Sequence, residues 1–363
     1  MKPTFDKIHV RFRLNGIHFN REELKEVAYS FIKEGAHYEH ITGDFLLDWV
    51  NDDPYIHVNT SGSTGKPKRI TLHKQHMVNS ALASGDFFGI SAGDSALHCL
   101  PSNFIAGKMM LVRAMILGLS IDLVEPTAHP MTTTEKSYDF SAMIPLQAKN
   151  SLEALHRIKK LIVGGAPVTK KLIKALQPKE TEVYETYGMT ETVTHIAAKK
   201  INGFSTPEEA LQTHFKTLPG VTISRDSRKC LIIEAPDISE TPIVTNDMVE
   251  IISDDEFRWI GRYDNVINSG GVKLIPEQIE KKLAAIIPCR FFVAGVPDEA
   301  LGEKLILVVE GKAVDKKALL QEIKTLPTLQ KYEIPKNIYL IDKFIETENG
   351  KVIREKNLKQ IGV

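Results

Sequence analysis

Helical and strand-like patterns alternate over the first two thirds of the chain. Apolar residues recur at helical spacing in three segments, residues 77–88, 108–117 and 169–176. Short apolar runs predict strands at residues 55–58, 69–72, 96–100, 120–124 and 161–163. This alternation is typical of an α/β layered domain.

The segment of residues 20–35 carries a helix signal at both ends. Asn20 is a favourable N-cap residue, and Glu23 stands three positions later, as in a capping box. Gly35 marks the expected end of the helix.

The pattern changes twice in the last third of the chain. Between Gly220 and Trp259 short strands dominate, which predicts a β-rich subdomain. Beyond residues 261–265 strands and helices mix again, with Pro276 well placed for a first helical turn. We therefore expect a large, layered N-terminal domain over residues 1–263 and a small, mobile α+β domain over residues 264–363.

Composition narrows the functional classes. The chain has 363 residues, of which 46 are Lys or Arg and 46 are Asp or Glu, so its formal net charge is zero. Nothing global therefore favours a nucleic acid or an anionic membrane as partner. The three cysteines are widely spaced, which argues against a disulfide framework and a structural zinc site. With no signal-peptide pattern and no apolar run long enough to cross a bilayer, we expect a cytoplasmic protein.

The segment from Thr60 to Lys68 combines four hydroxyl side chains, two glycines and two lysines. It has too little apolar surface for a core, but glycine backbone, hydroxyls and Lys66 suit a polyphosphate. It is not the common P-loop, because two residues, not four, separate Gly62 from Gly65. A flexible linker or hairpin tip is the alternative interpretation.

Two later segments offer groups that would suit a nucleotide. Residues 164–167, Gly-Gly-Ala-Pro, follow an apolar strand and would allow a flat ligand to come close; a simple strand-to-helix turn is the alternative. Residues 184–192 offer an aromatic ring at Tyr187, a hydroxyl at Thr190 and a carboxylate at Glu191 that suits Mg²⁺. An amphipathic strand edge is the alternative there.

Three more segments carry weaker signals. We expect residues 245–247 to form a bend whose carboxylate accepts ribose hydroxyls, or else an ordinary Asx turn. Arg262 and Asp264 stand at the change of composition, which suits a hinge or a plain linker. The Asn-Gly pair before Lys351 predicts a tight turn that presents this lysine, although one exposed lysine among many is the alternative.

Together these segments resemble the adenylate-forming superfamily of acyl-CoA synthetases, adenylation domains and luciferases. The resemblance runs in order from residue 60 to the C-terminus, through GGAP, YGMTE, Thr-x-Asp, GRxD, SGGxxxxPxxIE and GKxxR. It implies that a carboxylate attacks the α-phosphate of Mg·ATP to give an acyl-adenylate and pyrophosphate. CoA then displaces AMP.

The resemblance also implies a role for each matching residue. The ATP phosphates would be held by Thr60, Ser61, Gly62, Ser63, Thr64, Gly65 and Lys66. The rest of the nucleotide would contact Gly164, Gly165, Ala166, Pro167, Tyr187, Gly188, Thr190, Asp247 and Arg262. Glu191 would hold Mg²⁺, Lys351 would bridge the acid and the α-phosphate, and Asp264 would be the hinge. After a swing of the C-terminal domain, CoA would be approached by Ser269, Gly270, Gly271 and Lys273.

The short chain resembles in particular the o-succinylbenzoate–CoA ligases of menaquinone biosynthesis. Only 59 residues precede the phosphate loop, so part of the usual N-terminal subdomain would be absent or reduced, and Asn265 stands where relatives often have Asp or Lys. Such an acid has a second carboxylate, for which the candidate partners are Ser102, Lys108, Arg113 and His195. A solvated helix face is the alternative for Lys108 and Arg113.

Other activities remain open at this point. Another aryl- or acyl-CoA ligase would share the same motifs, and so would a freestanding adenylation enzyme that loads a carrier protein. The expected partners are a small carboxylic acid, ATP and CoA, with neither nucleic acid nor an integral membrane contact. A homodimer is left open.

Overall fold

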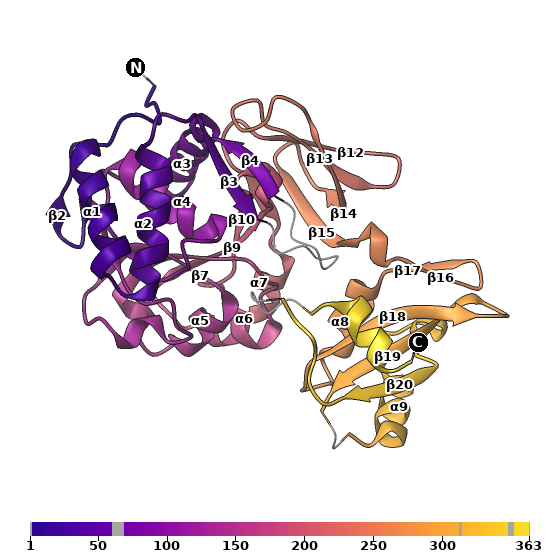
Figure 1. Cartoon of the computed structure of the whole chain (residues 1–363). Coiled ribbons are helices and arrows are strands. Elements are labelled where there is room, and N and C mark those ends of the chain that lie inside the picture. Colours follow the sequence, from indigo (N-terminus) through magenta and orange to yellow (C-terminus); the bar gives the residue numbers. More distant parts are fainter. Residues whose placement is uncertain (1, 60–68, 312–313, 348–351, 363) are drawn as a thin grey trace.

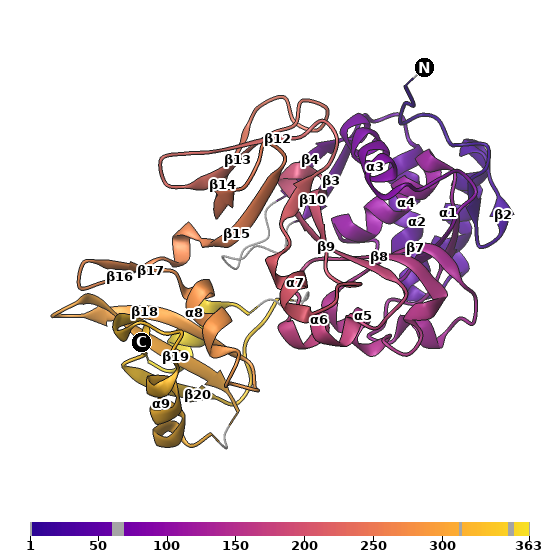
Figure 2. The same cartoon turned by 180° about the vertical axis from the view of Figure 1, so that it is seen from behind.

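The computed structural model describes residues 2–59, 69–311, 314–347 and 352–362, and Figure 1 shows its two unequal parts. The larger part, coloured indigo to salmon, is built on a 13-stranded sheet. The smaller part, coloured orange to yellow, is built on a five-stranded sheet. In Figures 1 and 2 the smaller part stands beside the salmon end of the larger part, away from the N-terminal helices.

The large sheet has the strand order β12-β13-β14-β15-β11-β10-β9-β8-β7-β5-β6-β1-β2. The run from β9 to β1 is parallel, and the remaining pairs are antiparallel. Its strands are β1 (Arg13–Leu14), β2 (Ile17–His18), β5 (Ser95–His98), β6 (Ser120–Leu123), β7 (Tyr138–Met143), β8 (Ile158–Val163), β9 (Glu182–Gly188), β10 (His195–Lys200), β11 (Phe215–Thr217), β12 (Thr222–Arg225), β13 (Cys230–Glu234), β14 (Ile243–Ile251) and β15 (Glu256–Arg262). A separate hairpin joins β3 (Tyr55–Asn59) to β4 (Arg69–His73).

Helices cover both faces of the parallel strands. They are α1 (Arg21–Glu34), α2 (His37–Val50), α3 (Lys74–Phe88), α4 (Ile105–Leu117), α5 (Pro145–Asn150), α6 (Lys170–Leu176) and α7 (Pro207–Gln212). Successive side chains of a strand point to opposite faces, so Ala96 joins the core under α1 to α4, whereas Leu97 joins the core with α5 and α6. The result is a three-layer arrangement, which agrees with the α/β layered domain expected from the alternating pattern.

The expected β-rich subdomain is an extension of the same sheet. Phe215 on β11 is the register partner of Phe257 on β15, and the antiparallel strands β11 and β10 then connect β12 to β15 with the parallel region. Val249 and Leu231 of these strands lie in one hydrophobic cluster with Ile196 and Ala197 of β10.

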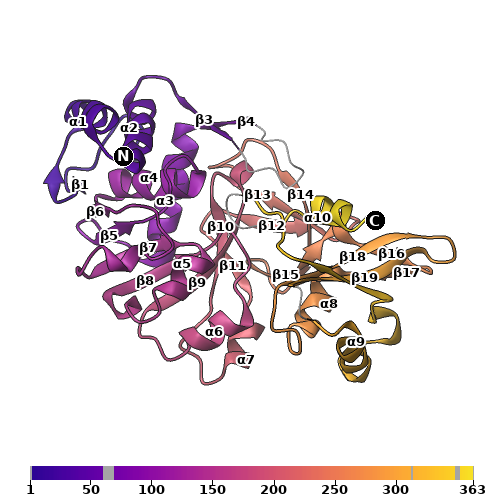
Figure 3. The same ribbon diagram turned by 60° about the horizontal axis from the view of Figure 1, so that its bottom comes forward.

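The smaller part forms after Arg262. Its elements are β16 (Ile267–Ser269), β17 (Val272–Leu274), α8 (Pro276–Leu283), β18 (Phe291–Asp298), β19 (Gly302–Glu310), α9 (Lys316–Thr325), β20 (Asn337–Ile341) and α10 (Arg354–Gln360). Figure 3 shows α10 beside the sheet, where Leu358 and Ile361 pack against the cluster that contains Phe292 and Ile306. Each part thus has its own core, which agrees with a division near residue 263, although the two-domain behaviour stays a prediction.

Short 3₁₀ turns connect several of these elements. They are η1 (Pro130–Thr132), η2 (Leu155–Arg157), η3 (Thr190–Thr192), η4 (Tyr263–Asn265) and η5 (Lys331–Glu333). Within the described ranges, no helix combines the length and apolar character that a membrane span requires.

Candidate active site

The Gly-Gly-Ala-Pro segment lies at the carboxyl edge of the parallel strands. Gly165 has a φ of +81°, a conformation that favours glycine. A Cβ on Gly164 would lie 2.5 Å from Thr186 Oγ1 on neighbouring β9, so the turn and that strand touch closely. Ala166 and Pro167 lead on to Thr169, whose hydroxyl caps α6 by accepting from the Leu172 amide at 3.2 Å. Open α/β sheets bind ligands at this edge.

Tyr187, at the end of β9, is fixed by Asp247 of β14. Its hydroxyl donates to Asp247 Oδ2 at 2.8 Å, and its ring packs edge-on against Phe257 with centroids 5.1 Å apart. Burial, and then the charge of Asp247, raise the pKa of Tyr187. The phenol therefore stays protonated and keeps donating. Only part of the ring surface remains exposed to meet a flat ligand.

Asp247 has two further partners. Trp259 Nε1 donates to its Oδ1 at 3.2 Å, and Arg262 NH1 lies 3.5 Å from the same oxygen. The Asp247 residue is only 7% exposed, so its carboxylate is stabilised by these donors rather than by water. A bound ribose would therefore have to share or displace existing hydrogen bonds.

The contact between Tyr187 and Asp247 shows that the sheet curves at this point. Four strand steps separate β9 from β14, and at about 4.8 Å a step a flat sheet would keep them far beyond the reach of one side chain. The irregular pairing of β10 at His195 and Ala197 accompanies this curvature. The bend brings together residues that are 60 positions apart in the sequence.

The expected bend at residues 245–247 is wrong. These residues lie inside β14, where Asp247 is the register partner of Arg262 on β15. Their polar groups are satisfied across the sheet, since Arg228 donates to Asn246 Oδ1 at 2.9 Å and to the Thr245 carbonyl at 3.2 Å. The Asp247 carboxylate is therefore held more rigidly than a loop would allow.

Asp264 lies in η4, directly beyond β15. It accepts from Arg262 NH2 at 2.9 Å and from Asn246 Nδ2 at 3.2 Å. The structure thus links the predicted hinge residue to the predicted ribose-binding pair. Its role as a hinge stays a prediction.

Thr190 and Glu191 lie in η3, which is stabilised by the hydroxyl of Thr192, its last residue. That hydroxyl accepts from the Met189 amide at 3.0 Å and lies 2.9 Å from the Met189 carbonyl and 2.7 Å from the Thr194 carbonyl. Val193 then has φ 64° and ψ −57°, and the Thr194 amide donates back to the Thr192 carbonyl at 2.7 Å. This is a strained γ-turn centred on a β-branched residue, of a kind that is often found next to functional sites.

Glu191 is exposed and offers one carboxylate at the carboxyl edge. Among the described residues there is no group of three His, Cys, Asp or Glu side chains placed to hold a metal ion. Mg²⁺ that arrives with a polyphosphate commonly takes only one or two protein carboxylates and keeps its waters. The donor set therefore fits such an ion.

Gly188 allows β9 and β10 to approach beside this turn. A Cβ there would lie 2.3 Å from the Thr194 carbonyl oxygen, which no side chain would tolerate.

Ser269, Gly270, Gly271 and Lys273 lie away from this group, on the β16–β17 hairpin. Gly270 and Gly271 have φ values of +58° and +81°, as a two-residue hairpin turn of type I′ requires. Within the described ranges no hydrogen bond or ion pair joins this hairpin to the Tyr187–Asp247 group. Residues 60–66 and Lys351 lie outside the described residues.

The four candidate partners of the acid's second carboxylate lie at three separate places in the structure. Lys108 is buried with its ammonium 4.5 Å from the Phe45 ring centroid, and Ser102 bonds to His98 and Thr42 at 2.9 and 3.0 Å. Arg113 and His195 touch each other, with NH2 3.4 Å from Nδ1. A solvated helix face is therefore wrong for both Lys108 and Arg113, because both side chains are buried.

Ser102 and His98 line a cavity of about 260 Å³ at the ends of β5 and β6. Tyr38 from α2, Phe104 and Glu125 are among the other residues of its wall. It lies at the same edge of the sheet as the Gly-Gly turn.

Sequence reasoning missed Trp259, Thr192 and Arg228. Trp259 stands three residues before Arg262, but nothing local shows that its indole reaches Asp247. Thr192 follows the YGMTE motif directly, and this position next to the motif was the signal that could have identified it.

Several known proteins resemble this chain. An acyl-CoA synthetase (AMP-forming)/AMP-acid ligase II-like protein from Dyadobacter fermentans is 36% identical, with a TM-score of 0.60, and the match covers 93% of this chain and 98% of that protein. The o-succinylbenzoate CoA synthetase from Bacillus subtilis, solved with the acyl-adenylate OSB-AMP, is 23% identical with a TM-score of 0.71, covering 83% and 68%. The 2-succinylbenzoate–CoA ligase of Enterococcus faecalis is 24% identical over 330 residues, which are 82% of this chain and 67% of that protein.

The family comparison covers the region that holds the Gly-Gly turn, Tyr187 and Glu191. Residues 33–223, more than half of the chain, match the family model described as AMP-binding enzyme. The geometry above and this match lead to the same conclusion: the chain belongs to the AMP-binding enzyme family.

Proposed function

We propose that this protein is an AMP-forming acid–CoA ligase whose substrate is 2-succinylbenzoate, in menaquinone biosynthesis. The observation that carries the proposal is the convergence of the Gly164–Gly165 turn, Tyr187, Asp247 and Arg262 on one curved edge of the sheet. The relatives named above, which include ligases for this acid, support the choice of substrate.

The reaction has two steps. A carboxylate oxygen attacks the α-phosphorus of ATP, the bond from that phosphorus to the bridging oxygen breaks, and pyrophosphate leaves. The CoA sulfur then attacks the acyl carbon, the carbon–oxygen bond breaks, and AMP leaves while the thiol proton passes to solvent.

The residues of this chain have distinct roles in the proposal. Asp247 accepts the ribose hydroxyls, while Tyr187 presents its ring to the adenine. Glu191 would hold Mg²⁺, which neutralises charge on the phosphate oxygens when bound. Residues 60–66 are proposed to hold the phosphates and Lys351 to bridge the two reacting anions, because a positioned cation offsets the charge that develops there.

The test is a panel of carboxylic acids. Each acid is incubated with ATP and Mg²⁺, pyrophosphate release is measured, and the thioester is then identified by mass spectrometry after CoA is added. We expect 2-succinylbenzoate to give the highest kcat/KM and free CoA to saturate. Pyrophosphate release without turnover of CoA would indicate an enzyme that loads a carrier protein. Preference for another acid would indicate a different CoA ligase. No pyrophosphate release with any acid would refute the proposal.

A further inference from the structure

The cavity at the ends of β5 and β6 has no role in the reaction proposed above. Its volume is about 260 Å³, whereas a cavity of about 150 Å³ is enough to bind a benzene molecule. It lies where two parallel strands end, since the Val124 amide, directly after β6, donates to the carbonyl of His98, the last residue of β5, at 3.0 Å. Ligands of open α/β sheets bind outside such strand ends.

The wall of this cavity suits an uncharged ring. Among its described lining residues there is one acid, Glu125, and neither Lys nor Arg. Burial, and then the charges of Glu39 and Glu125, raise the pKa of Tyr38, so the wall disfavours an anion. Apolar or aromatic surface is supplied by Tyr38, Ile41, Leu100, Phe104 and Val124.

A chain of hydrogen bonds fixes the ring proton of His98. The Tyr38 carbonyl takes the single hydroxyl proton of Thr42 at 2.9 Å, so the Thr42 oxygen accepts from Ser102 at 3.0 Å. Ser102 has then used its own proton, and it accepts from His98 Nε2 at 2.9 Å. With its proton on Nε2, the ring carries a lone pair on Nδ1.

That lone pair has no partner among the described residues. His98 is 3% exposed, and its Nδ1 is buried without a hydrogen bond in the described part of the chain. Burial lowers the pKa of His98 to about 4, so the ring is neutral at neutral pH and Nδ1 stays an acceptor. A buried acceptor that lacks a donor costs free energy, which the donor of a ligand would recover.

We propose that this cavity is a binding site for a small, uncharged aromatic molecule that carries a hydroxyl group, such as a phenol. The hydroxyl donates to His98 Nδ1, and the ring packs beside Tyr38, Leu100 and Phe104. The described lining of the cavity includes none of the residues proposed to hold ATP. Binding needs neither ATP nor the acid, so this proposal stands or falls separately from the proposed function.

The test uses three probes that differ in the group on one benzene ring. Phenol offers a donor, acetophenone only an acceptor, and benzoate a negative charge. Each is titrated into the full chain, and dissociation constants are obtained from the NMR shifts of the Leu100 and Val124 amides. We expect a Kd of roughly 1 mM for phenol. Acetophenone should bind about 10-fold more weakly, because its carbonyl would face a lone pair, and benzoate more weakly still.

Two variants of the chain of hydrogen bonds test the role of Nδ1. His98→Phe keeps a ring but removes the acceptor, and it should weaken phenol binding about 10-fold. Thr42→Val removes the acceptor of the Ser102 proton. Ser102 then donates to His98 Nε2, the ring proton moves to Nδ1, and Nδ1 becomes a donor. This variant should bind acetophenone more tightly than phenol, which reverses the wild-type order.

His37→Gln is the matched control, because His37 also lines the cavity but is exposed. It should leave the order of the three probes unchanged. If His98→Phe does not fold, Thr42→Val, which keeps the shape of the side chain, carries the test. Absence of phenol binding, equal phenol affinity of His98→Phe and wild type, or the wild-type order of probes in Thr42→Val would overturn the proposal.

Discussion

At the scale of single residues, buried polar side chains form a chain of hydrogen bonds in which each donor and acceptor is fixed. Thr42 donates its only proton to the Tyr38 carbonyl at 2.9 Å, so Ser102 must donate to Thr42. The Ser102 oxygen then accepts from His98 Nε2 at 2.9 Å, and His98 Nδ1 is left buried with no hydrogen-bond partner among the described residues. Burial lowers the pKa of His98 to about 4.

The burial of His98 in this chain of hydrogen bonds predicts that the protein loses stability in acid. In the unfolded chain His98 takes up a proton near pH 6.5, but the folded protein does so only near pH 4. Between these values the unfolded state binds more protons, so the free energy of unfolding falls as pH decreases, by on the order of 3 kcal/mol. Urea unfolding at pH 7, 5.5 and 4.5 should show a shallower fall for His98→Gln than for wild type. Substitution of the exposed His40 should leave the slope unchanged, and parallel curves for His98→Gln and wild type would contradict the prediction.

At the scale of elements, helix α8 is joined to the segment that leads out of β15. Asn265 Nδ2 donates to Glu277 Oε1 in the first turn of α8, and Gln278 Nε2 donates to the Ile260 carbonyl at 2.6 Å. Gly261 leaves the necessary space, because a Cβ there would lie 2.5 Å from Glu277 Oε2. Arg354, three residues after the predicted catalytic lysine, lies 3.7 Å from Glu277 and 2.9 Å from Glu280. The C-terminal segment is thereby tied to the predicted hinge.

Asn265→Asp should weaken this junction. The new carboxylate would face Glu277, so a hydrogen bond is replaced by like-charge repulsion, and we expect the free energy of unfolding to fall by about 1–3 kcal/mol. Thermal unfolding of the full chain measures the effect. Asn265→Lys, of opposite sign, is the matched control and should keep wild-type stability; equal unfolding temperatures for the two variants would show that Glu277 does not sense this position.

The elements also show how far the sequence determines the fold. Both ends of α1 were predicted, because the Asn20–Glu23 capping box is local and is present in the structure. Helix α2 was missed, since its N-cap residue, Ala36, has no capping side chain. The polar triplet at 245–247 suggested a bend, because its partners Arg228 and Tyr187 are distant in sequence. The motifs identified the candidate site residues. The curvature of the sheet, which joins Tyr187 to Asp247, could not be predicted from them.

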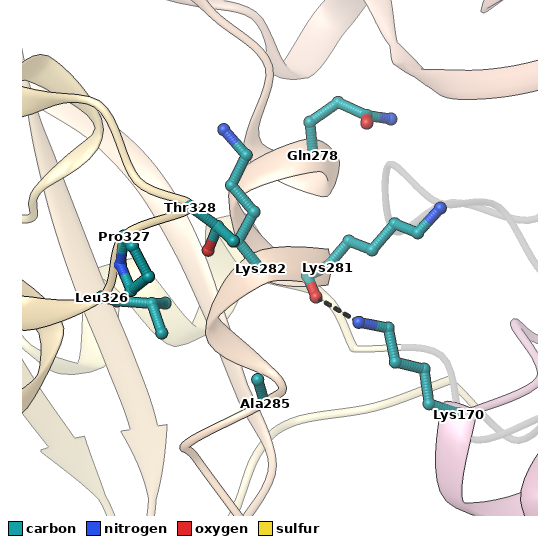
Figure 4. A pocket seen from close by; sticks show the side chains of 8 residues that line it. All are labelled: Lys170, Gln278, Lys281, Lys282, Ala285, Leu326, Pro327 and Thr328. Carbon is teal, nitrogen blue, oxygen red and sulfur yellow. Dashed lines mark hydrogen bonds between the residues drawn. The ribbon is translucent and has the colours of Figure 1, made fainter. Parts of the chain in front are cut away.

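At the scale of the whole molecule, the polar contacts between the described residues of the two parts include one from Gln278 to the Ile260 carbonyl and one on α6. Lys170 on α6 donates to the Lys281 carbonyl of α8 at 2.9 Å, as Figure 4 shows. A crevice of about 330 Å³ adjoins this contact, with Leu326 and Pro327 on its far side. Contacts between two parts of one chain resemble those of transient interfaces, so we expect the relative orientation of the two parts to change.

If the C-terminal part swings between the half-reactions, Lys351 is needed in only one of them. Lys351→Ala should slow adenylation, measured as pyrophosphate release, by at least about 100-fold, because a lost cation at the reacting centre costs about 3–4 kcal/mol. Thioester formation from preformed acyl-adenylate should remain near the wild-type rate. Equal losses in both steps would argue against the swing, and near-normal adenylation would refute the role of the lysine.

The contact of Lys170 with a backbone oxygen makes the two sides of this joint unequal. Almost any residue at position 281 still presents that oxygen, whereas at position 170 only a long side chain with a donor at its tip reaches it. In a library randomised at both positions and selected for enzyme activity, the active variants should carry many different residues at position 281 on α8 but few at position 170 on α6.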